Sequence, residues 1–458
     1  MTTKNPSLRP SRRVVHFIGI GGIGMSALAR YFLSQNWAVS GSDAAAGVIT
    51  QSLIKDGVRV KIGHKKGYVP PGATLVVTSQ AISRENPEVR EALRCGLRVL
   101  TYPEAIGELT HRYKTVAIAG SHGKSTTTAL SALTLTKGGF DPTVIVGTNL
   151  KEFGGKNFRA GKSELLVLEA DEFGRAFHHY SPLVAIVTNI DREHLDVYKN
   201  IVGVKKSFLR FLGNTVDGGA LILNHDDKNL YSLKKEVATL AKKKNLIVVW
   251  YSLKDRTTAK IKKTLKIFGE HNISNATAVY QLGRLFDVSE KDIFAALGSY
   301  GGAWRRMEYR GAAKIKGIKE PALVYDDYAH HPTEIKATLA AFKEQFPDRT
   351  LICVFQPHQG KRLKLLFKEF TTAFAIADAV ILLPLYKVRE HGEKLVRESS
   401  DLASAIKKYT PRKQVIYLEN PGKLQAVING LLIPRSPLIV MMGAGDIVDH
   451  TEKLLSFR

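Results

Sequence analysis

The chain has 458 residues, enough for about three domains of ~150 residues each. Hydrophobic residues make up 44% and charged residues 24%, which excludes a disordered or fibrous protein. The net charge of +25 favours an anionic partner: nucleic acid, acidic lipid or a phosphorylated metabolite. The two cysteines, Cys95 and Cys353, cannot form a disulfide framework or a cysteine-based zinc site, so we expect a cytoplasmic protein.

The N-terminal segment MTTKNPSLRPSRR is polar and basic, so no signal peptide is expected. No apolar run approaches the ~18 residues that cross a bilayer, so membrane insertion is not expected either. Short apolar runs alternate with helical stretches, which predicts an α/β fold with doubly wound parallel sheets. The predicted strands include Val14–Ile18, Leu75–Val77, Val116–Ala119, Leu165–Leu168, Ala185–Thr188, Ala322–Tyr325, Leu351–Phe355, Ala379–Leu383 and Pro437–Met442.

A glycine-rich loop follows the first predicted strand and opens a helix, in the string VVHFIGIGGIGMSALARYFL. Gly19, Gly21 and Gly24 have G-x-G-x-x-G spacing, which permits a tight turn and close backbone approach to a diphosphate. Asp43, at the end of the next strand-like run, is placed to accept hydrogen bonds from a ribose. The motif predicts a nucleotide-binding domain, and it does not separate NAD from a UDP-sugar.

A second loop, in KTVAIAGSHGKSTTTALSAL, adds a lysine to the same strand–loop–helix arrangement. Backbone N–H groups around Gly120 and Gly123 can surround phosphate oxygens. Lys124 then places its charge on the β- and γ-phosphates, and Ser125 can ligate Mg²⁺. The loop is shorter than G-x-x-x-x-G-K-[ST], and it indicates ATP-dependent chemistry, for which hydride transfer has no use.

Acidic residues and a histidine follow the next two buried strands. Carboxylates and imidazoles at strand ends can hold Mg²⁺ against a transferring phosphate. We interpret Glu169 and His194 as functional, and Asp191 and Glu193 as solvated loop charges. The full set is Glu169, Asp171, Glu172, Asn189, Asp191, Glu193, His194 and Asp196.

A fourth group of polar residues lies in the last part of the chain. Asn272 and Asn275, three residues apart on a helix, can read an adenine edge. Arginine suits phosphate binding, a carboxylate at a strand end can bind ribose, and paired histidines can contact a base or phosphate. No further His or Cys set accompanies the histidine pair, so zinc is not expected. The residues are Arg305, Arg306, Asp326, Asp327, His330 and His331.

The order of these strings resembles the Mur ligase family over nearly the whole chain. The strings are GIGGIGMSALA, AGSHGKSTTT, EADE, VTNIDREHLD, GEHNISNA, RRME, DDYAHHPTEI, VFQPH and MGAGDI. The resemblance implies three domains, which our boundaries place at 1–108, 109–303 and 304–458. They would be a Rossmann-like UDP-sugar-binding domain, a central P-loop ATP-binding domain and a Rossmann-like C-terminal domain for the amino acid.

The activity implied is the ATP- and Mg²⁺-dependent joining of L-alanine to the lactyl carboxylate of UDP-N-acetylmuramate, through an acyl phosphate, in peptidoglycan precursor synthesis. A related ligase that adds a tripeptide or another amino acid is the alternative, although the first glycine loop and VFQPH argue against the tripeptide. A P-loop nucleic-acid-binding protein would explain the net charge but not the first loop, so no nucleic-acid partner is expected. An NAD dehydrogenase would leave Lys124 without a role. The chain can be a monomer or a dimer.

By motif position, the resemblance implies a role for each matched residue. The UDP-sugar would contact Gly19, Gly21, Gly22, Gly24 and Asp43. ATP would be held by Gly120, Ser121, His122, Gly123, Lys124, Ser125, Thr126, Asn272, Asn275, Arg306 and Asp327. The metal ions would be surrounded by Ser125, Glu169 and His194, and the cleft facing the third domain would be lined by His330, His358 and Arg362. The catalytic set implied is Lys124, Glu169, His194, Arg306 and His330.

Two segments depart from the family pattern. Phe173, Gly174 and Arg175 stand where small or acidic residues are usual. Gln359, Gly360 and Lys361 replace most of an Arg-Tyr-Ser-Arg string, of which Arg362 remains. The second departure leads us to expect an effect on the choice of amine.

Overall fold

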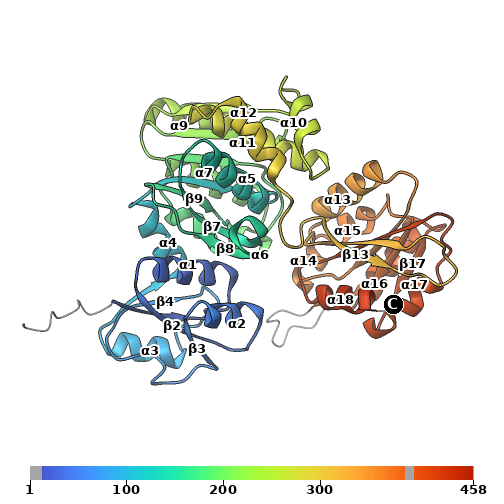
Figure 1. Cartoon of the computed structure of the whole chain (residues 1–458), viewed down its shortest axis with the longest axis horizontal. Helices are drawn as coiled ribbons and strands as arrows, with labels where there is room; N and C mark the ends of the chain where they lie inside the picture. The colour runs from blue at the N-terminus through green and yellow to red at the C-terminus, as the bar shows by residue number, and fades with distance from the viewer. Residues whose placement is uncertain (1–12, 387–396, 457–458) are drawn as a thin grey trace, which may run out of the picture. The chain divides into compact units, whose positions relative to one another are not determined.

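The computed structural model describes residues 13–386 and 397–456. Within these residues the strands form three sheets, in the orders β3-β2-β1-β4-β5, β12-β11-β10-β6-β9-β7-β8 and β13-β14-β18-β15-β16-β17 (Figure 1). Neighbouring strands run parallel except for the pairs β7–β8 and β13–β14. The predicted α/β fold is confirmed, since each of the nine strands named from the sequence overlaps an observed strand.

The first sheet places the first glycine loop and Asp43 at its carboxyl edge. Phe17, Ile18 and Val76 are completely buried, because parallel strands covered by helices bury both faces. Figure 1 shows the blue strands of this sheet beside α2 and α3. The elements are β1 (Val14–Ile18), α1 (Ile23–Ser34), β2 (Ala38–Asp43), α2 (Val48–Lys55), β3 (Arg59–Ile62), β4 (Ala73–Thr78), α3 (Pro87–Arg94), β5 (Arg98–Thr101) and α4 (Tyr102–Thr110).

The second sheet carries the phosphate-loop candidate between its central strand β6 and α5. Its elements begin with β6 (Lys114–Ala119), α5 (Lys124–Lys137), β7 (Thr143–Leu150), β8 (Lys156–Arg159), β9 (Leu165–Glu169), the 3-10 segment η2 (Phe173–His179), β10 (Val184–Val187), α6 (Leu195–Tyr198) and α7 (Ile201–Gly213). They continue with β11 (Ala220–Asn224), α8 (Lys228–Tyr231), α9 (Lys234–Lys244), β12 (Ile247–Tyr251), α10 (Thr258–Thr264), α11 (Glu270–Leu285) and α12 (Glu290–Ser299).

The third sheet begins with an antiparallel edge strand and continues as a parallel sheet around β18. Pro332 starts α13, where His331 and Glu334 form a reciprocal cap at the helix start. The principal elements are β13 (Glu308–Ala313), β14 (Ala322–Asp327), α13 (Pro332–Gln345), β15 (Thr350–Phe355), α14 (Gly360–Leu365), α15 (Phe367–Ala373), β16 (Ala379–Leu382), α16 (Ser399–Tyr409), β17 (Gln414–Tyr417), α17 (Leu424–Asn429), β18 (Pro437–Met442) and α18 (Ile447–Ser456).

The chain divides into two compact units. The first contains the described parts of Met1–Asp255 together with Ala276–Leu297, and the second contains Arg256–Asn275 and the described parts of Gly298–Arg458. Among the described residues, no helix has the length and apolar character that crossing a membrane requires.

Polar contacts join the first and second sheets inside the first unit. Arg30 on α1 donates to Asp56 at 2.7 Å and to the side-chain oxygen of Asn157 on β8 at 2.5 Å. Lys156 donates to the second oxygen of Asp56 at 2.7 Å. The nucleotide-sugar and phosphate-loop candidates therefore belong to one connected body.

Candidate active site

The phosphate-loop candidate wraps the start of α5. Gly120 and Gly123 have φ values of +139° and +84°, which side chains other than hydrogen rarely permit. A Cβ atom on Gly120 would lie 2.0 Å from Thr188 Oγ1, so this position also requires glycine for space. Gly123 caps α5 without a side chain, and the helix start therefore directs backbone N–H groups and its positive dipole end toward the loop. This arrangement suits a phosphate.

Lys124 lies under that loop with its charge held by carboxylates. Its Nζ donates to the carbonyl oxygen of Gly120 and to Glu172 Oε2, both at 2.8 Å, and lies 3.9 Å from Asp171 Oδ1. Burial by itself lowers the pKa of Lys124, but Glu172 and Asp171 outweigh burial and raise that pKa well above its usual value. Lys124 is therefore charged at any physiological pH.

Two groups of oxygen and nitrogen ligands lie near Lys124. Ser125 Oγ donates to Glu169 Oε1 at 3.1 Å, and the other oxygen of Glu169 accepts the N–H of Gly147 at 2.7 Å. The ligand atoms of Asp171, Glu172 and His194 lie within 4.8 Å of one another. Oxygen donors of this kind suit Mg²⁺, so the structure brings Ser125 and Glu169 together and places His194 with the two following carboxylates.

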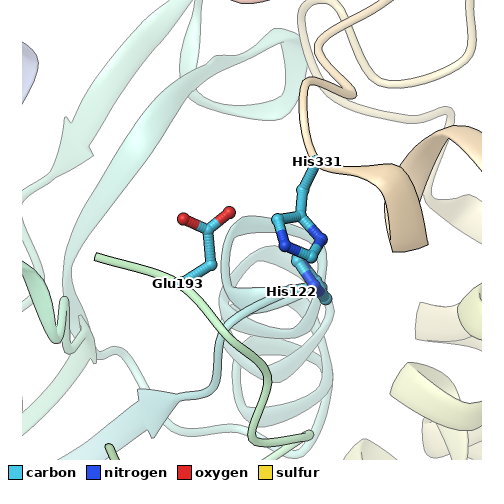
Figure 2. A group of neighbouring side chains, drawn as sticks. All are labelled: His122, Glu193 and His331. Carbon is cyan, nitrogen blue, oxygen red and sulfur yellow. The ribbon is translucent and has the colours of Figure 1, made fainter. Parts of the chain in front are cut away.

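The loop after β10 corrects the interpretation of Asp191 and Glu193 as solvated charges. Asp191 Oδ2 lies 3.0 Å from His122 Nε2, and the Asp191 N–H donates to Ser121 Oγ at 2.8 Å. Glu193 is only 5% exposed. Figure 2 shows Glu193 on this loop and His122 on the loop before α5, and their ligand atoms lie within 4.8 Å of each other. Both carboxylates belong to the phosphate-loop neighbourhood because the carboxyl ends of β6 and β10 are adjacent.

Asn189 and Glu172 also belong to this site, although neither of them was assigned a role from the sequence. The Asn189 side chain accepts the His122 N–H at 2.8 Å and donates to the His122 carbonyl at 3.0 Å, which fixes the loop backbone. Glu172 is the direct counter-charge of Lys124. Both residues stand in motif strings at strand ends, so position at a strand end was the signal that could have found them.

At the first glycine loop, Gly19, Gly21 and Gly24 each occupy a position that disfavours a side chain. Gly19 has a φ of +80°, and the Gly21 N–H donates to Asp43 Oδ2 at 2.7 Å. A Cβ on Gly21 would lie 2.8 Å from the same oxygen, and one on Gly24 would lie 2.8 Å from the Tyr102 ring. Asp43 therefore shapes this loop as well as standing at the strand end where a ribose site was predicted.

In the second unit, Asp327 anchors the turn that carries the arginines. Its carboxylate accepts the N–H groups of Met307 at 2.8 Å and Ala329 at 2.9 Å, and the hydroxyl of Thr338 at 3.2 Å. Burial raises the pKa of Asp327. Arg306 lies 3.7 Å from Glu334 and over the Tyr328 ring.

The remaining candidates of the second unit lie on several of its elements. The Asn272 side chain, on α11, donates to the Phe268 carbonyl at 2.8 Å, and Asn275 is buried on the same helix. The rings of His330 and His358 have centroids 6.0 Å apart, and Arg362 lies on α14. His331, also drawn in Figure 2, caps α13. The structure thus brings His330 and His358 together, while Asn272 and Asn275 share a helix.

Three family models match consecutive parts of the chain. They are the Mur ligase family catalytic domain at residues 14–114, the Mur ligase middle domain at 118–283, and the Mur ligase glutamate ligase domain at 305–445. Together these matches cover each of the three observed sheets.

Curated relatives match the chain over nearly its full length. The UDP-N-acetylmuramate–L-alanine ligase of Desulforapulum autotrophicum is 37% identical over 456 residues, covering 96% of this chain and 98% of the relative. That of Desulfatibacillum aliphaticivorans is 38% identical over 462 residues, covering 97% and 98%.

Solved structures share the architecture. The UDP-N-acetylmuramate-alanine ligase of Thermotoga maritima aligns with a TM-score of 0.76 at 25% identity, covering 96% of this chain and 97% of that one. A murein peptide ligase from Psychrobacter arcticus aligns with a TM-score of 0.67 at 22% identity, covering 97% and 98%. The second likeness concerns the fold alone.

Proposed function

Because the chain belongs to the Mur ligase family, we propose that it is the ATP-dependent ligase that joins L-alanine to the lactyl carboxylate of UDP-N-acetylmuramate. The observation that carries this proposal is the position of Lys124, whose side chain is only 14% exposed, under a glycine loop at the start of α5. Full-length relatives that bear this activity in their names support the choice of substrates.

The reaction must turn a carboxylate, which is a poor acyl donor, into a reactive acyl group. A lactyl carboxylate oxygen attacks the γ-phosphorus of ATP, and ADP leaves. The L-alanine amine then attacks the acyl carbon, loses a proton, and phosphate leaves with one former carboxylate oxygen. The chain's contribution is positioning and charge stabilisation, with Lys124 and the start of α5 facing the phosphates.

The donor set fits Mg²⁺, since the Ser125 hydroxyl and the Glu169 carboxylate lie 3.1 Å apart at the loop that would hold the phosphates. We propose that these two residues and His194 hold the metal. When bound, Mg²⁺ would neutralise charge on the phosphate oxygens. The neighbouring carboxylates Asp171 and Glu172 keep Lys124 protonated and in place.

By motif position, we propose that the first glycine loop and Asp43 contact the UDP-sugar. We also propose that residues of the second unit contact the nucleotide and the amino acid. Its residues are Asn272, Asn275, Arg306, Asp327, His330, His358 and Arg362. ATP and nucleotide sugars are cytoplasmic metabolites, so we place the reaction in the cytoplasm.

An oxygen-transfer experiment tests the proposed function. UDP-N-acetylmuramate labelled with ¹⁸O in its lactyl carboxylate is incubated with the enzyme, ATP, Mg²⁺ and L-alanine. We expect one ¹⁸O atom in each released phosphate and an alanine-containing nucleotide product. Unlabelled phosphate, or ATP cleavage that does not depend on L-alanine and the nucleotide sugar, would reject the proposal.

A further inference from the structure

A buried polar cluster lies within the first sheet and its helix α3, and no role was assigned to its residues above. Glu88 on α3 is completely buried. Its Oε2 lies 2.8 Å from His16 Nε2, and its Oε1 lies 2.8 Å from His64 Nδ1. The hydroxyl of Ser42 donates to the same Oε1, also at 2.8 Å. A buried carboxylate is unfavourable unless its charge and lone pairs are satisfied, and this cluster satisfies them.

The local sequence explains how Glu88 reaches this place. Asn86 caps α3 by accepting the Glu88 N–H at 2.9 Å, and Pro87 occupies the first helical position. Burial raises the pKa of Glu88, but hydrogen bonds from His16, His64 and Ser42 outweigh burial and hold that pKa below its usual value. Glu88 is therefore an ionised acceptor at neutral pH.

Ser42 connects this carboxylate to the first glycine loop. The Ser42 carbonyl accepts the N–H groups of Gly19 at 2.8 Å and Ile20 at 3.0 Å. The next residue, Asp43, accepts the Gly21 N–H at 2.7 Å through its side chain. The end of β2, which Glu88 holds through the Ser42 hydroxyl, thus fixes three consecutive backbone groups of the loop.

His64 stands at the same edge of the sheet. The Gly63 N–H donates to the Asp43 carbonyl at 2.8 Å, so the turn after β3 lies beside the end of β2. The His64 side chain is 18% exposed, while Glu88 is buried beneath it. When Nδ1 carries the proton that Glu88 accepts, Nε2 is the ring atom left to accept a hydrogen bond.

On these contacts, and resting on the proposed function, we propose that Glu88 is a positioning residue for the nucleotide-sugar site. It fixes the ring of His64 so that Nε2 accepts a hydrogen bond from a hydroxyl of the nucleotide sugar, on either its ribose or its hexose. A carboxylate behind a ligand-binding histidine sets both the ring orientation and the position of the ring proton. Glu88 itself does not touch the ligand.

A double-mutant cycle in the full-length enzyme tests this role. The variants are Glu88→Gln, His64→Ala and the double variant, with Glu91→Gln as the control. Glu91 lies on the same helix and accepts the Gly67 N–H in an exposed contact. Calorimetry measures dissociation constants for UDP-N-acetylmuramate, for UDP and for ATP, and thermal unfolding checks folding.

Each single variant is expected to weaken UDP-N-acetylmuramate binding about tenfold, the size of one lost hydrogen bond, and to leave ATP binding unchanged. In the His64→Ala variant, the further substitution Glu88→Gln should weaken nucleotide-sugar binding very little, because Glu88 acts through His64. The same loss with UDP assigns the hydroxyl to the ribose, and a loss confined to UDP-N-acetylmuramate assigns it to the hexose.

Unchanged nucleotide-sugar affinity in His64→Ala, or fully multiplicative losses in the cycle, would overturn the inference. His64 is partly exposed, so its variant decides the question even where Glu88→Gln fails to fold. Wild-type enzyme that binds no UDP-N-acetylmuramate rejects the proposed function together with this inference. Wild-type enzyme that binds it as tightly as both variants do rejects the positioning role alone.

Discussion

The ammonium nitrogen of Lys124 lies 2.8 Å from a carboxylate oxygen of Glu172, whose side chain is 1% exposed. The two residues come from neighbouring parallel strands, β6 and β9, through the segments that follow them. Their ion pair fixes the lysine under the glycine loop before any phosphate arrives. An enzyme that stabilises charge on a transferring phosphoryl group requires such preorganisation.

Replacing this lysine tests the phosphate-loop assignment. Lys124→Ala should lower the ligation rate by more than about a thousandfold, because the fixed positive charge that we propose to face the phosphates is removed. The fold should remain, since burial favours protonation of the Glu172 carboxyl left behind. Phosphate release and circular dichroism measure the two effects. Lys137→Ala, at the other end of α5, is the control and should retain normal turnover.

Ser125→Ala tests the proposed magnesium site. The Mg²⁺ concentration that gives half-maximal ligation should rise about tenfold, because one oxygen ligand is lost beside Glu169. Chelation with EDTA should abolish turnover in the wild type. Ser131→Ala makes the same substitution at a buried position on α5 and should leave the Mg²⁺ requirement unchanged. An unaltered Mg²⁺ dependence in Ser125→Ala would remove this residue from the metal site.

Alanine substitutions at two neighbouring glycines of the first glycine loop test its geometry. Gly21→Ala should destabilise the fold by about 1–3 kcal/mol, because the new Cβ would lie 2.8 Å from the Asp43 carboxylate. Gly22→Ala should cost less than about 1 kcal/mol, since its nearest neighbour lies 3.5 Å away and its φ is −65°. Urea unfolding of both variants provides the measurement. Equal stability of the two would contradict the described loop geometry.

Acid stability should depend on Asp56, which binds Arg30 and Lys156. Burial raises the pKa of Asp56, but hydrogen bonds from Lys156 and Arg30 outweigh burial and hold it below its usual value of 3.8. Because the pKa of Asp56 is lower in the folded state than in the unfolded state, the ionised carboxylate stabilises the fold at pH values above 3.8. This stabilisation is lost as the pH falls through the folded-state pKa. Asp56→Asn should therefore lower the free energy of unfolding by about 1–2 kcal/mol at pH 7.

The difference between Asp56→Asn and wild type should shrink as the pH falls below 3.8. Chemical unfolding at a series of pH values checks this convergence. Asp217→Asn removes a carboxylate that is 82% exposed beside Lys244, and it should have little effect at any pH. A difference that persists unchanged into acid would show that the Asp56 charge does not stabilise the first unit.

The sequence predicted the sheets and the loops well because apolar strands and glycine spacing are local signals. Lys124 and Ser125 stood in a recognisable string, and Gly19 to Gly24 followed a clear strand. The burial of Glu193 and the contact of Asp191 with His122 could not be predicted, since both depend on the adjacency of β6 and β10. Glu88 shows the same limit, because its partners His64 and His16 lie 24 and 72 residues away in sequence.

Amine choice is the most direct test of the central claim, since the string after VFQPH departs from the family pattern at Gln359 to Lys361. L-alanine, L-serine, glycine and the cell-wall tripeptide are offered together with UDP-N-acetylmuramate, ATP and Mg²⁺, and the products are weighed by mass spectrometry. We predict that the L-alanine adduct dominates. Exclusive formation of the tripeptide adduct would contradict the account.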